Sequence, residues 1–314
     1  MFERVLTATD MLGACDAAVV TALEIAKQNQ GKLFVMHVLE LSYFHECGPL
    51  ESVKHFKTGE DTAASQEYKE TVKQELDKKC EGALKPYGNY EIDIAYGKPS
   101  IEIRRWARKF GANLIVLGPH AGRPEEEKEL IGIPIGNTVE DVIMHTTTPV
   151  MIINRLIPKE RLNFKKVMVC IDFSKSCEYA FQFAAKLAQR YSSKLFLFHA
   201  LTMTPPGSHL QAEMEKEISA SQKRLTEFCK IPGGLEHDYG IREGTQPYAQ
   251  ILNYAKEKDV DLIVMSSRVK EIGESRHVGS VVEQVCARCS CPVVIVTHPD
   301  ALLKMESFPA KPLS

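Results

Sequence analysis

The sequence repeats itself at the scale of a whole domain. The segment RVLTATD, which begins at Arg4, is echoed by KVMVCID from Lys166, and KLFVMH from Lys32 is echoed by KLFLFH from Lys194, both at an offset of 162 residues. Later matches run at offsets of 148 and 143 residues, which places two insertions in the first copy. Solenoid repeats are only about 20 to 50 residues long. The chain is therefore a tandem duplication, and we expect both copies to adopt the same fold.

The length of 314 residues leaves room for two domains of about 150 residues, each able to bury its own core. We predict a first domain over residues 1–154, a linker over 155–165, a second domain over 166–298 and a C-terminal tail over 299–314. The linker segment is short and polar. The tail contains Pro299, Pro309 and Pro312 and shows no periodic pattern, so we expect it to be ordered only where it packs on a domain.

Charge and composition exclude several classes of partner. With 39 basic and 41 acidic residues, the formal net charge is -2, which gives no global electrostatic reason to bind nucleic acid or an anionic membrane. No apolar run approaches membrane-spanning length, and the first residues lack a targeting pattern. Nine cysteines, an odd number, do not form a secreted disulfide framework. We therefore expect a cytoplasmic protein with reduced thiols.

Short apolar runs alternate with segments of helical period along each copy. In the first copy the predicted strands cover residues 5–9, 32–38, 90–95, 113–117 and 149–153. Four helical segments separate them, and the second copy repeats the order. The stretch from residue 39 to about 61 is expected to be irregular. Continuous apolar strands separated by helices are typical of a parallel sheet covered on both faces, so the predicted class is α/β, twice over.

Several motifs resemble the universal stress protein family, in its tandem two-domain form. They are Thr9-Asp10 and the matching IDFS from Ile171, the histidines His37 and His199 that end the second strand, and GSVVEQV from Gly279 followed by CPVVIV. The resemblance implies two doubly wound parallel five-stranded sheets in the order 3-2-1-4-5, related by a pseudo-two-fold axis. It also implies that nucleotide, when bound, lies at the carboxyl ends of strands one and four. An exposed apolar edge is costly, so we expect the last strands of the two domains to pair internally.

The phosphate loop of nucleotide-binding members, G-x2-G-x9-G-S/T, is altered in both copies. The first copy has three residues between Gly118 and Gly122, and then a longer, glutamate-containing stretch before Gly136. The second copy has Ser266 and Val269 in place of the first two glycines and keeps Gly279. A β-branched residue does not readily take the positive φ of a tight phosphate turn. We therefore predict that both triphosphate loops are eroded.

The family pattern, carried over position by position, gives the candidate ligand-binding residues. In the first copy these are Asp10, Val38, Gly118, Gly122, Gly136, Asn137 and Thr138. In the second copy they are Asp172, Ala200, Ser266, Gly279, Ser280 and Val281. Each aspartate could contact a ligand at a strand end or could cap a helix, and each glycine could bind phosphate or serve mainly as a cap.

Other chemistry-bearing residues favour structural roles. No nucleophile or acid is repeated with His37 and His199, so both are interpreted as structural histidines. His45, Glu46, Cys47 and His55 match no standard zinc spacing, and no metal site is predicted. Thiolate is disfavoured at a helix carboxyl end, which makes Cys286 and Cys289, spaced as C-x2-C, inert packing residues.

We predict a stress-response protein that senses a ligand or acts as a scaffold and is not an enzyme. No cofactor is assigned to it. One alternative is an ATP-binding protein with slow hydrolysis, using ATP with magnesium and acting mainly through the first domain. A further alternative is a binder of a lipid-like molecule, with residues 41–61 as a cover. We expect the two domains to pair with each other within the chain, and a homodimer of the chain is possible. Unidentified proteins are further expected partners. No binding to nucleic acid or to a membrane is expected.

Overall fold

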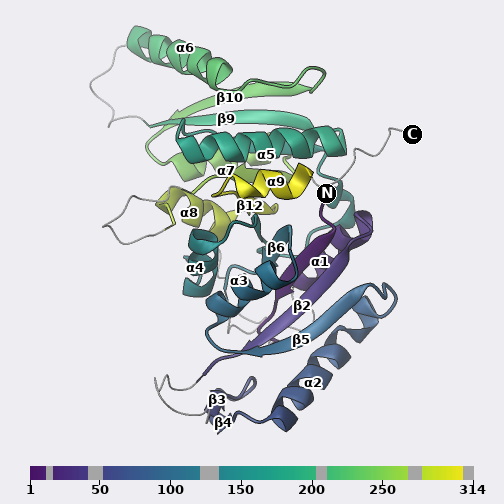
Figure 1. Ribbon diagram of the computed structural model, residues 1–314. Helices are drawn as coiled ribbons and strands as arrows, with labels where there is room; N and C mark the ends of the chain where they lie inside the picture. Colours follow the sequence, from purple (N-terminus) through teal and green to yellow (C-terminus); the bar gives the residue numbers. More distant parts are fainter. Residues whose placement is uncertain (12–16, 42–51, 121–133, 203–210, 268–277, 307–314) are drawn as a thin grey trace. The chain divides into compact units, whose positions relative to one another are not determined.

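A computed structural model of the protein describes residues 1–11, 17–41, 52–120, 134–202, 211–267 and 278–306. The chain divides into two compact units, unit 1 from Met1–Leu156 and unit 2 from Ile157–Ser314. In each unit parallel strands alternate with helices (Figure 1). The predicted α/β class is confirmed.

The described residues of unit 1 form a parallel sheet of β1, β2, β5, β6 and β7, together with four helices and a small hairpin. The bounds are β1 Arg4–Ala8, α1 Ala17–Gln28, β2 Lys32–Leu39, β3 Ser52–Lys54, β4 Asp61–Ala63, α2 Gln66–Leu84, β5 Tyr90–Tyr96, α3 Pro99–Lys109, β6 Leu114–Leu117, α4 Asn137–His145 and β7 Val150–Ile152. Pairing places the parallel strands in the order β5-β2-β1-β6-β7.

The order of the strands reverses at β1, and this reversal creates the crevice in which a ligand can lie. The chain proceeds from β1 to β2 and β5 on one side, and then crosses back to β6 and β7 on the other side. Because crossovers between parallel strands are right-handed, the reversal sends successive helices to opposite faces of the sheet. The loops after β1 and β6 therefore separate at the carboxyl edge and leave a switch point there.

A short antiparallel hairpin corrects one sequence-based expectation for unit 1. The segment up to residue 61 was expected to be irregular, but Ser52–Lys54 and Asp61–Ala63 pair as β3 and β4. An isolated bridge between Leu41 and Val53 and a hydrogen bond from Lys54 N to Glu40 O (2.9 Å) attach β3 to the end of β2. The hairpin therefore projects from the carboxyl edge of the sheet.

Unit 2 repeats the plan without a described hairpin. Its elements are the 3-10 turn Lys159–Asn163, β8 Lys166–Cys170, α5 Lys175–Tyr191, β9 Lys194–Thr202, α6 Gln211–Phe228, β10 His237–Gly244, α7 Pro247–Glu257, β11 Leu262–Met265, α8 Ser280–Arg288, β12 Val293–Ile295 and α9 Asp300–Glu306. Its strands pair in the order β10-β9-β8-β11-β12, and all of these pairs are parallel.

Local sequence signals explain where the helices begin. Ser65 and Ser174 cap α2 and α5, since their side chains accept hydrogen bonds from Tyr68 N and Cys177 N. Pro99 and Pro247 stand in the first turn of the equivalent helices α3 and α7, where a missing N–H costs nothing. The two copies thus start their third helices with the same device.

The segments that flank the second domain carry more structure than the sequence suggests. Within the predicted linker, Leu162 and Phe164 are buried and Arg161 pairs with Asp259 and Asp261 of unit 2. Within the predicted tail, residues 300–306 form α9, which contacts α5. Residues 157–165 of the predicted linker and residues 300–306 of the predicted tail therefore belong to unit 2.

Candidate functional site

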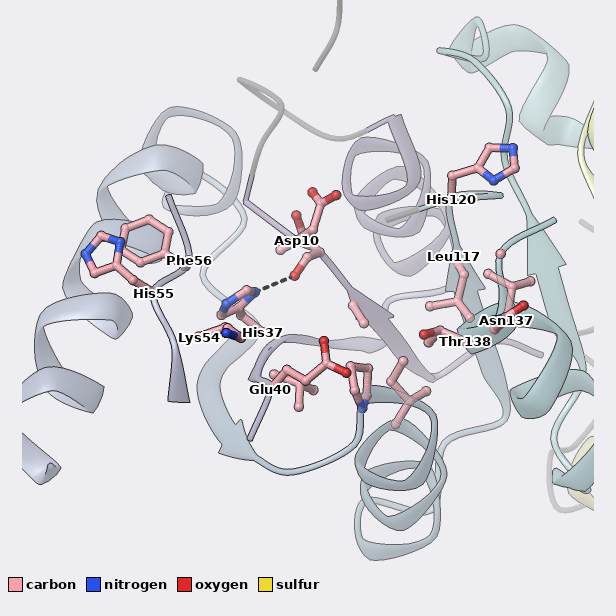
Figure 2. Close-up of a pocket in the computed structure, with 18 residues that line it drawn as sticks. Asp10, His37, Glu40, Lys54, His55, Phe56, Leu117, His120, Asn137 and Thr138 are labelled. Carbon is pink, nitrogen blue, oxygen red and sulfur yellow. Dashed lines mark hydrogen bonds between the residues drawn. The ribbon is translucent and has the colours of Figure 1, made fainter. Parts of the chain in front are cut away.

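The carboxyl edge of the unit 1 sheet contains a cavity of about 510 Å³. It lies at the switch point between β1 and β6, where open parallel sheets bind ligands. Figure 2 shows the hairpin side chains His55 and Phe56 on one side of the view and Asn137 and Thr138 of α4 on the other. The lining residues are Ala8, Thr9, Asp10, His37, Val38, Glu40, Lys54, His55, Phe56, Pro99, Ile103, Leu117, Gly118, His120, Gly136, Asn137, Thr138 and Val139.

This cavity brings together the predicted site residues of the first copy. All of them that the structure describes line it, namely Asp10, Val38, Gly118, Gly136, Asn137 and Thr138. Gly122 lies outside the described residues, as do His45, Glu46 and Cys47. The individual ligand-binding candidates did not include Glu40, Lys54, Phe56 or His120. His55 was considered for a metal, and residues 41–61 were considered as a whole, as a cover for a lipid-like molecule. The sequence feature that could have pointed to Lys54, His55 and Phe56 is their location in an insertion that the second copy lacks.

His37 connects the ends of the two central strands of unit 1. Its Nδ1 atom lies 2.8 Å from the carbonyl oxygen of Thr9, the residue directly before Asp10. Because a carbonyl oxygen can only accept, Nδ1 carries the proton and Nε2 carries a lone pair in the neutral ring. Burial lowers the pKa of His37, although the hydrogen bond to Thr9 and the charge of Asp10 act in the opposite direction. The structural role predicted for His37 is present, and the same side chain also lines the cavity.

The hairpin forms an aromatic wall beside His37. The Phe56 ring stands edge-on to the His37 ring with centroids 6.3 Å apart, and it stacks on His55 at 5.2 Å. Phe56 N donates to the Tyr68 hydroxyl of α2 at 3.2 Å, which ties the hairpin to that helix. The Lys54 ammonium pairs with Asp61 at 2.8 Å. The insertion therefore adds both a flat apolar surface and charge to the cavity.

The opposite wall is the amino end of α4. Gly136 is its N-cap, and the first turn of any helix leaves N–H groups without partners in the helix. The backbone of Gly136 has φ -68° and ψ 151°, which any residue can adopt. A Cβ atom added there would lie 3.6 Å from the Pro119 oxygen, an ordinary contact. The fold therefore does not require glycine at this position.

A second cavity, of about 440 Å³, occupies the equivalent edge of unit 2. All lining residues except Phe198 match lining residues of the unit 1 cavity at the repeat offsets. They are Cys170, Ile171, Asp172, Phe198, His199, Ala200, Thr202, Pro247, Ile251, Met265, Ser266, Gly279, Ser280, Val281 and Val282. Every candidate residue of the second copy is among them. The duplication has therefore preserved two cavities at one location in the fold.

His199 repeats the contact made by His37, whereas Asp172 is held by its own loop. His199 Nδ1 lies 2.8 Å from the Ile171 oxygen. The Asp172 carboxylate accepts hydrogen bonds from both the backbone N (2.9 Å) and the hydroxyl (2.6 Å) of Ser174, the N-cap of α5. The capping alternative is therefore wrong for Asp172, because Ser174 is the N-cap and Asp172 holds that residue in place.

The residue after each aspartate has an unusual backbone conformation. Met11 has φ 66° and Phe173 has φ 60°, values that non-glycine residues seldom adopt. Phe173 packs against His199 at 4.7 Å and against Phe228 at 5.6 Å, and the Arg224 guanidinium lies over its ring at 4.1 Å. Strained residues that recur at one place in both copies mark the turn that presents the aspartate at the cavity.

The cysteines of the C-x2-C segment are buried, as expected for packing residues. Cys286, Cys289 and Cys291 are all buried, and burial raises the pKa of Cys286. The close contact with Cys289, together with burial, raises the pKa of Cys291. Thiols held in the protonated form are poor nucleophiles and poor metal ligands. Among the described residues there is no cluster of three or more His, Cys, Asp or Glu side chains that could hold a metal ion.

Comparison with known proteins identifies the family of the chain. The sequence profile of the Universal stress protein family matches residues 1–154 and again residues 163–297. The chain belongs to the universal stress protein family. Its family resemblance and its tandem form, with one family domain in each half, are both confirmed.

Curated universal stress proteins match single halves of the chain. Universal stress protein YxiE of Bacillus subtilis is 30% identical over 147 residues, which is 42% of this chain and 99% of that protein. Universal stress protein MJ0531 of Methanocaldococcus jannaschii is 25% identical over 154 residues, 47% of this chain and 91% of that protein. A solved universal stress protein of Archaeoglobus fulgidus aligns over 95% of this chain and 99% of its own, with a TM-score of 0.62 and 19% identity.

None of the helices in the described part of this universal stress protein is both long and apolar enough to cross a bilayer.

Proposed function

We propose that this universal stress protein senses a nucleotide through the cavity of unit 1 and responds by a change in conformational populations instead of by turnover. The observation that carries the proposal is the convergence of Asp10, at the end of β1, with the amino end of α4 on one cavity of about 510 Å³. A carboxylate can accept from a base amine or a ribose hydroxyl, and the N–H groups of a helix end suit phosphate. Because both features line the same cavity, one ligand with a polar end and an anionic end would suit it.

The glycine at the start of α4 supports the same conclusion. The backbone angles and the space at Gly136 would accept another residue, so glycine there is explained by a ligand that approaches the backbone closely. Gly279 is the counterpart in unit 2, and a Cβ atom added there would meet nothing within 4 Å. Neither glycine is explained by packing in the described structure.

The charged and polar side chains at the hairpin end of the unit 1 cavity favour nucleotide over a lipid-like ligand. The hairpin that would cover an apolar molecule contributes Lys54 and His55 as well as Phe56, and the strand before it contributes Glu40. Burying such groups against hydrocarbon without hydrogen bonds is costly. We infer that the hairpin is a wall for a polar aromatic ligand.

Isothermal titration of the full-length protein tests the proposal. The probes are ATP with magnesium, AMP, and the nucleotides dAMP and cAMP, which are bound in two solved universal stress proteins. We expect micromolar binding of at least one of them, and loss of that binding in Gly136→Asp, which puts a carboxylate at the helix amino end. Gly279→Asp makes the same change in unit 2 and should leave binding to unit 1 intact.

Two outcomes would reject the proposal. The first is the absence of heat and of a thermal shift with millimolar nucleotide, and the second is binding that survives Gly136→Asp in a folded protein. Phosphate release measured with ATP and magnesium separates sensing from catalysis. Release that depends on Gly136 would favour slow hydrolysis. A small molecule that copurifies and is detected by native mass spectrometry would favour the lipid-like alternative.

A further inference from the structure

We propose that Lys79 of α2 is a positioning residue, which holds the turn after β1 in the conformation that places Asp10 at the unit 1 cavity. Arg224 of α6 has the same task in unit 2, where it acts on an aromatic ring instead of on the backbone. The inference rests on the proposed function only for the importance of Asp10 to a ligand. The contacts that carry it come from helices that supply none of the lining residues of either cavity.

The turn after β1 needs a restraint, because Met11 has φ 66°. A non-glycine residue keeps such a conformation only where its surroundings hold it. In unit 1 both peptide groups that flank Met11 are held. The Met11 N–H donates to the Thr9 hydroxyl at 3.0 Å, and the Met11 carbonyl accepts from the Lys79 ammonium. With both peptide planes held, the orientation of the peptide group that joins Met11 to Asp10 is fixed as well.

The helix that carries Lys79 also holds the hairpin wall of the cavity. The Tyr68 hydroxyl accepts from Phe56 N at 3.2 Å, and Glu75 pairs with Lys57 at 2.8 Å. At about 100° per residue, Tyr68, Glu75 and Lys79 lie within about 40° of one another around the helix axis. Figure 1 shows β3 and β4 beside the first turn of α2. One face of α2 thus contacts both the hairpin and the Asp10 turn.

The neighbouring face of α2 makes the helix a fixed support. Val72, Leu76, Cys80 and Leu84 are buried and recur every four residues. Their packing keeps α2 in place without help from Lys79, whose side chain reaches the turn from an exposed position. Removal of the ammonium should therefore free the turn and leave the hairpin as it is.

Unit 2 repeats the arrangement with different groups. Lys79 and Arg224 are equivalent by burial, since each comes directly before one buried residue and five residues before another. Phe173, with φ 60°, takes the place of Met11, and the Arg224 guanidinium lies 4.1 Å from the centre of its ring, where a cation is attracted to the aromatic face. At the matching offset α2 and α6 differ at most positions. A cation has therefore been kept at one position of a helix that has otherwise diverged.

Amide hydrogen exchange of the full-length protein without ligand tests the inference. Lys79→Met should speed exchange in residues 9–11 about fivefold, because the loss of a hydrogen bond makes local opening easier. Exchange in the hairpin and in β6 should not change. Lys79→Arg keeps a donor and should restore slow exchange. Lys78→Met alters the adjacent exposed lysine, which lies about 100° away around the helix, and should have no effect.

Variants at the other contacts should give complementary patterns. Tyr68→Phe removes the acceptor of Phe56 N and should speed exchange in the hairpin alone. Arg224→Met should speed exchange around Phe173 and leave residues 9–11 unchanged. In titrations with AMP and with ATP and magnesium, Lys79→Met should weaken the binding about fivefold with an unchanged melting temperature, and Lys79→Arg should retain the affinity.

The inference and the proposed function can fail separately. Unchanged exchange in residues 9–11 of Lys79→Met, or an increase that extends to β6, would overturn the inference and leave the proposed function standing. Unchanged affinity in a Lys79→Met protein whose turn exchanges faster would also overturn the positioning role. If neither nucleotide binds the unmodified protein but Lys79→Met loosens the turn, the proposed function falls, while the restraint of the turn by Lys79 stands.

Discussion

The two cavities occupy the same place in the same fold and differ in chemistry. The unit 1 cavity is lined by Glu40, Lys54 and three histidines, whereas unit 2 has Thr202 at the position of Glu40 and His199 as its one described histidine. Glu40 and Thr202 stand at equivalent backbone positions, as do His37 and His199, whereas Lys54 and His55 belong to the insertion in unit 1. The comparison shows that the sheet and its switch point determine where the two cavities lie, while side chains and one inserted hairpin determine the chemistry of their linings.

The comparison extends from the cavities to the cores. The helix after the first strand buries Thr21 in unit 1 and Phe183 at the same position in unit 2. The residue directly before the fourth parallel strand is Asn113 in unit 1 and Asp261 in unit 2. Its side-chain oxygen accepts a hydrogen bond from the backbone N of the first residue of the first strand, at 3.2 Å in unit 1 and 3.0 Å in unit 2. Equivalent positions in the two units are therefore filled by different side chains. Substitutions at these positions can test whether they contribute equally to the stability of each unit.

The largest effect is expected from the core position of the first helix. Phe183 is fully buried, and Phe183→Ala should lower the free energy of unfolding of unit 2 by about 3 to 5 kcal/mol. The Thr21 hydroxyl is buried with no hydrogen-bond partner among the described residues, so Thr21→Val should instead stabilise unit 1, by up to about 1 kcal/mol. Urea denaturation measures both. Equal losses in the two variants would contradict the difference between the cores.

A smaller effect is expected where Arg161 meets Asp261. Burial raises the pKa of Asp261, and Arg161, whose Nε lies 3.0 Å from its carboxylate, opposes that rise. Arg161→Ala should destabilise unit 2 by about 1 to 2 kcal/mol at pH 7, because a buried carboxylate loses its partner. When the pKa of a carboxyl is higher in the folded state than in the unfolded state, the protonated carboxyl favours folding. Its contribution to the free energy of unfolding is largest below the unfolded-state pKa and is lost as the pH rises through the folded-state pKa. The penalty of Arg161→Ala should therefore shrink toward pH 4.

The matched variants for this pair come from unit 1. Adding Asp261→Asn to Arg161→Ala copies Asn113 and should recover most of the lost stability at pH 7. Asp259→Ala removes the more exposed partner of Arg161 and should cost less than Arg161→Ala. If the double variant were no more stable than Arg161→Ala, the cause would be lost packing and not an unpaired charge.

The smallest effect is the pH dependence that His37 gives to unit 1. Burial lowers its pKa below the ordinary value of 6.5, so the unfolded state binds the proton more readily than the folded state. Stability should therefore fall as pH decreases from about 7 through the folded pKa, with a slope of at most about 1.4 kcal/mol per pH unit for one proton. His37→Gln should flatten this part of the profile. A profile between pH 7.5 and 5 that is the same in both proteins would show that His37 does not titrate on unfolding.

Sequence patterns predicted the parallel strands and the helices between them, because apolar runs and helical periods report burial directly. The resemblance to the family predicted Asp10 and Gly136 as site residues, and their positions at a strand end and a helix start beside the switch point agree with that prediction. The hairpin could not be predicted, because its strands are three residues long and mostly polar, and they are held by pairing with the end of β2. The participation of Glu40 and Phe56 in the cavity follows from that hairpin.

Other roles needed coordinates because they depend on contacts between distant residues. The repeated His37 was visible in the sequence, but its tautomer follows from the Thr9 oxygen beside Nδ1. Arg161 appeared to be one charge in a polar linker, and its partners Asp259 and Asp261 follow nearly one hundred residues later. Such pairs leave no local pattern, since both members look like ordinary surface residues in the sequence.

The covalent joining of the two units has a consequence for how their sites can evolve. In an assembly of identical subunits, each substitution appears in every site at once, so a change that improves one response alters all of them. A tandem chain escapes this constraint, and Glu40 and Thr202 are free to diverge while the ratio of the two sites stays fixed at one to one. A single polypeptide can thus combine two inputs of different sensitivity without any control over subunit mixing.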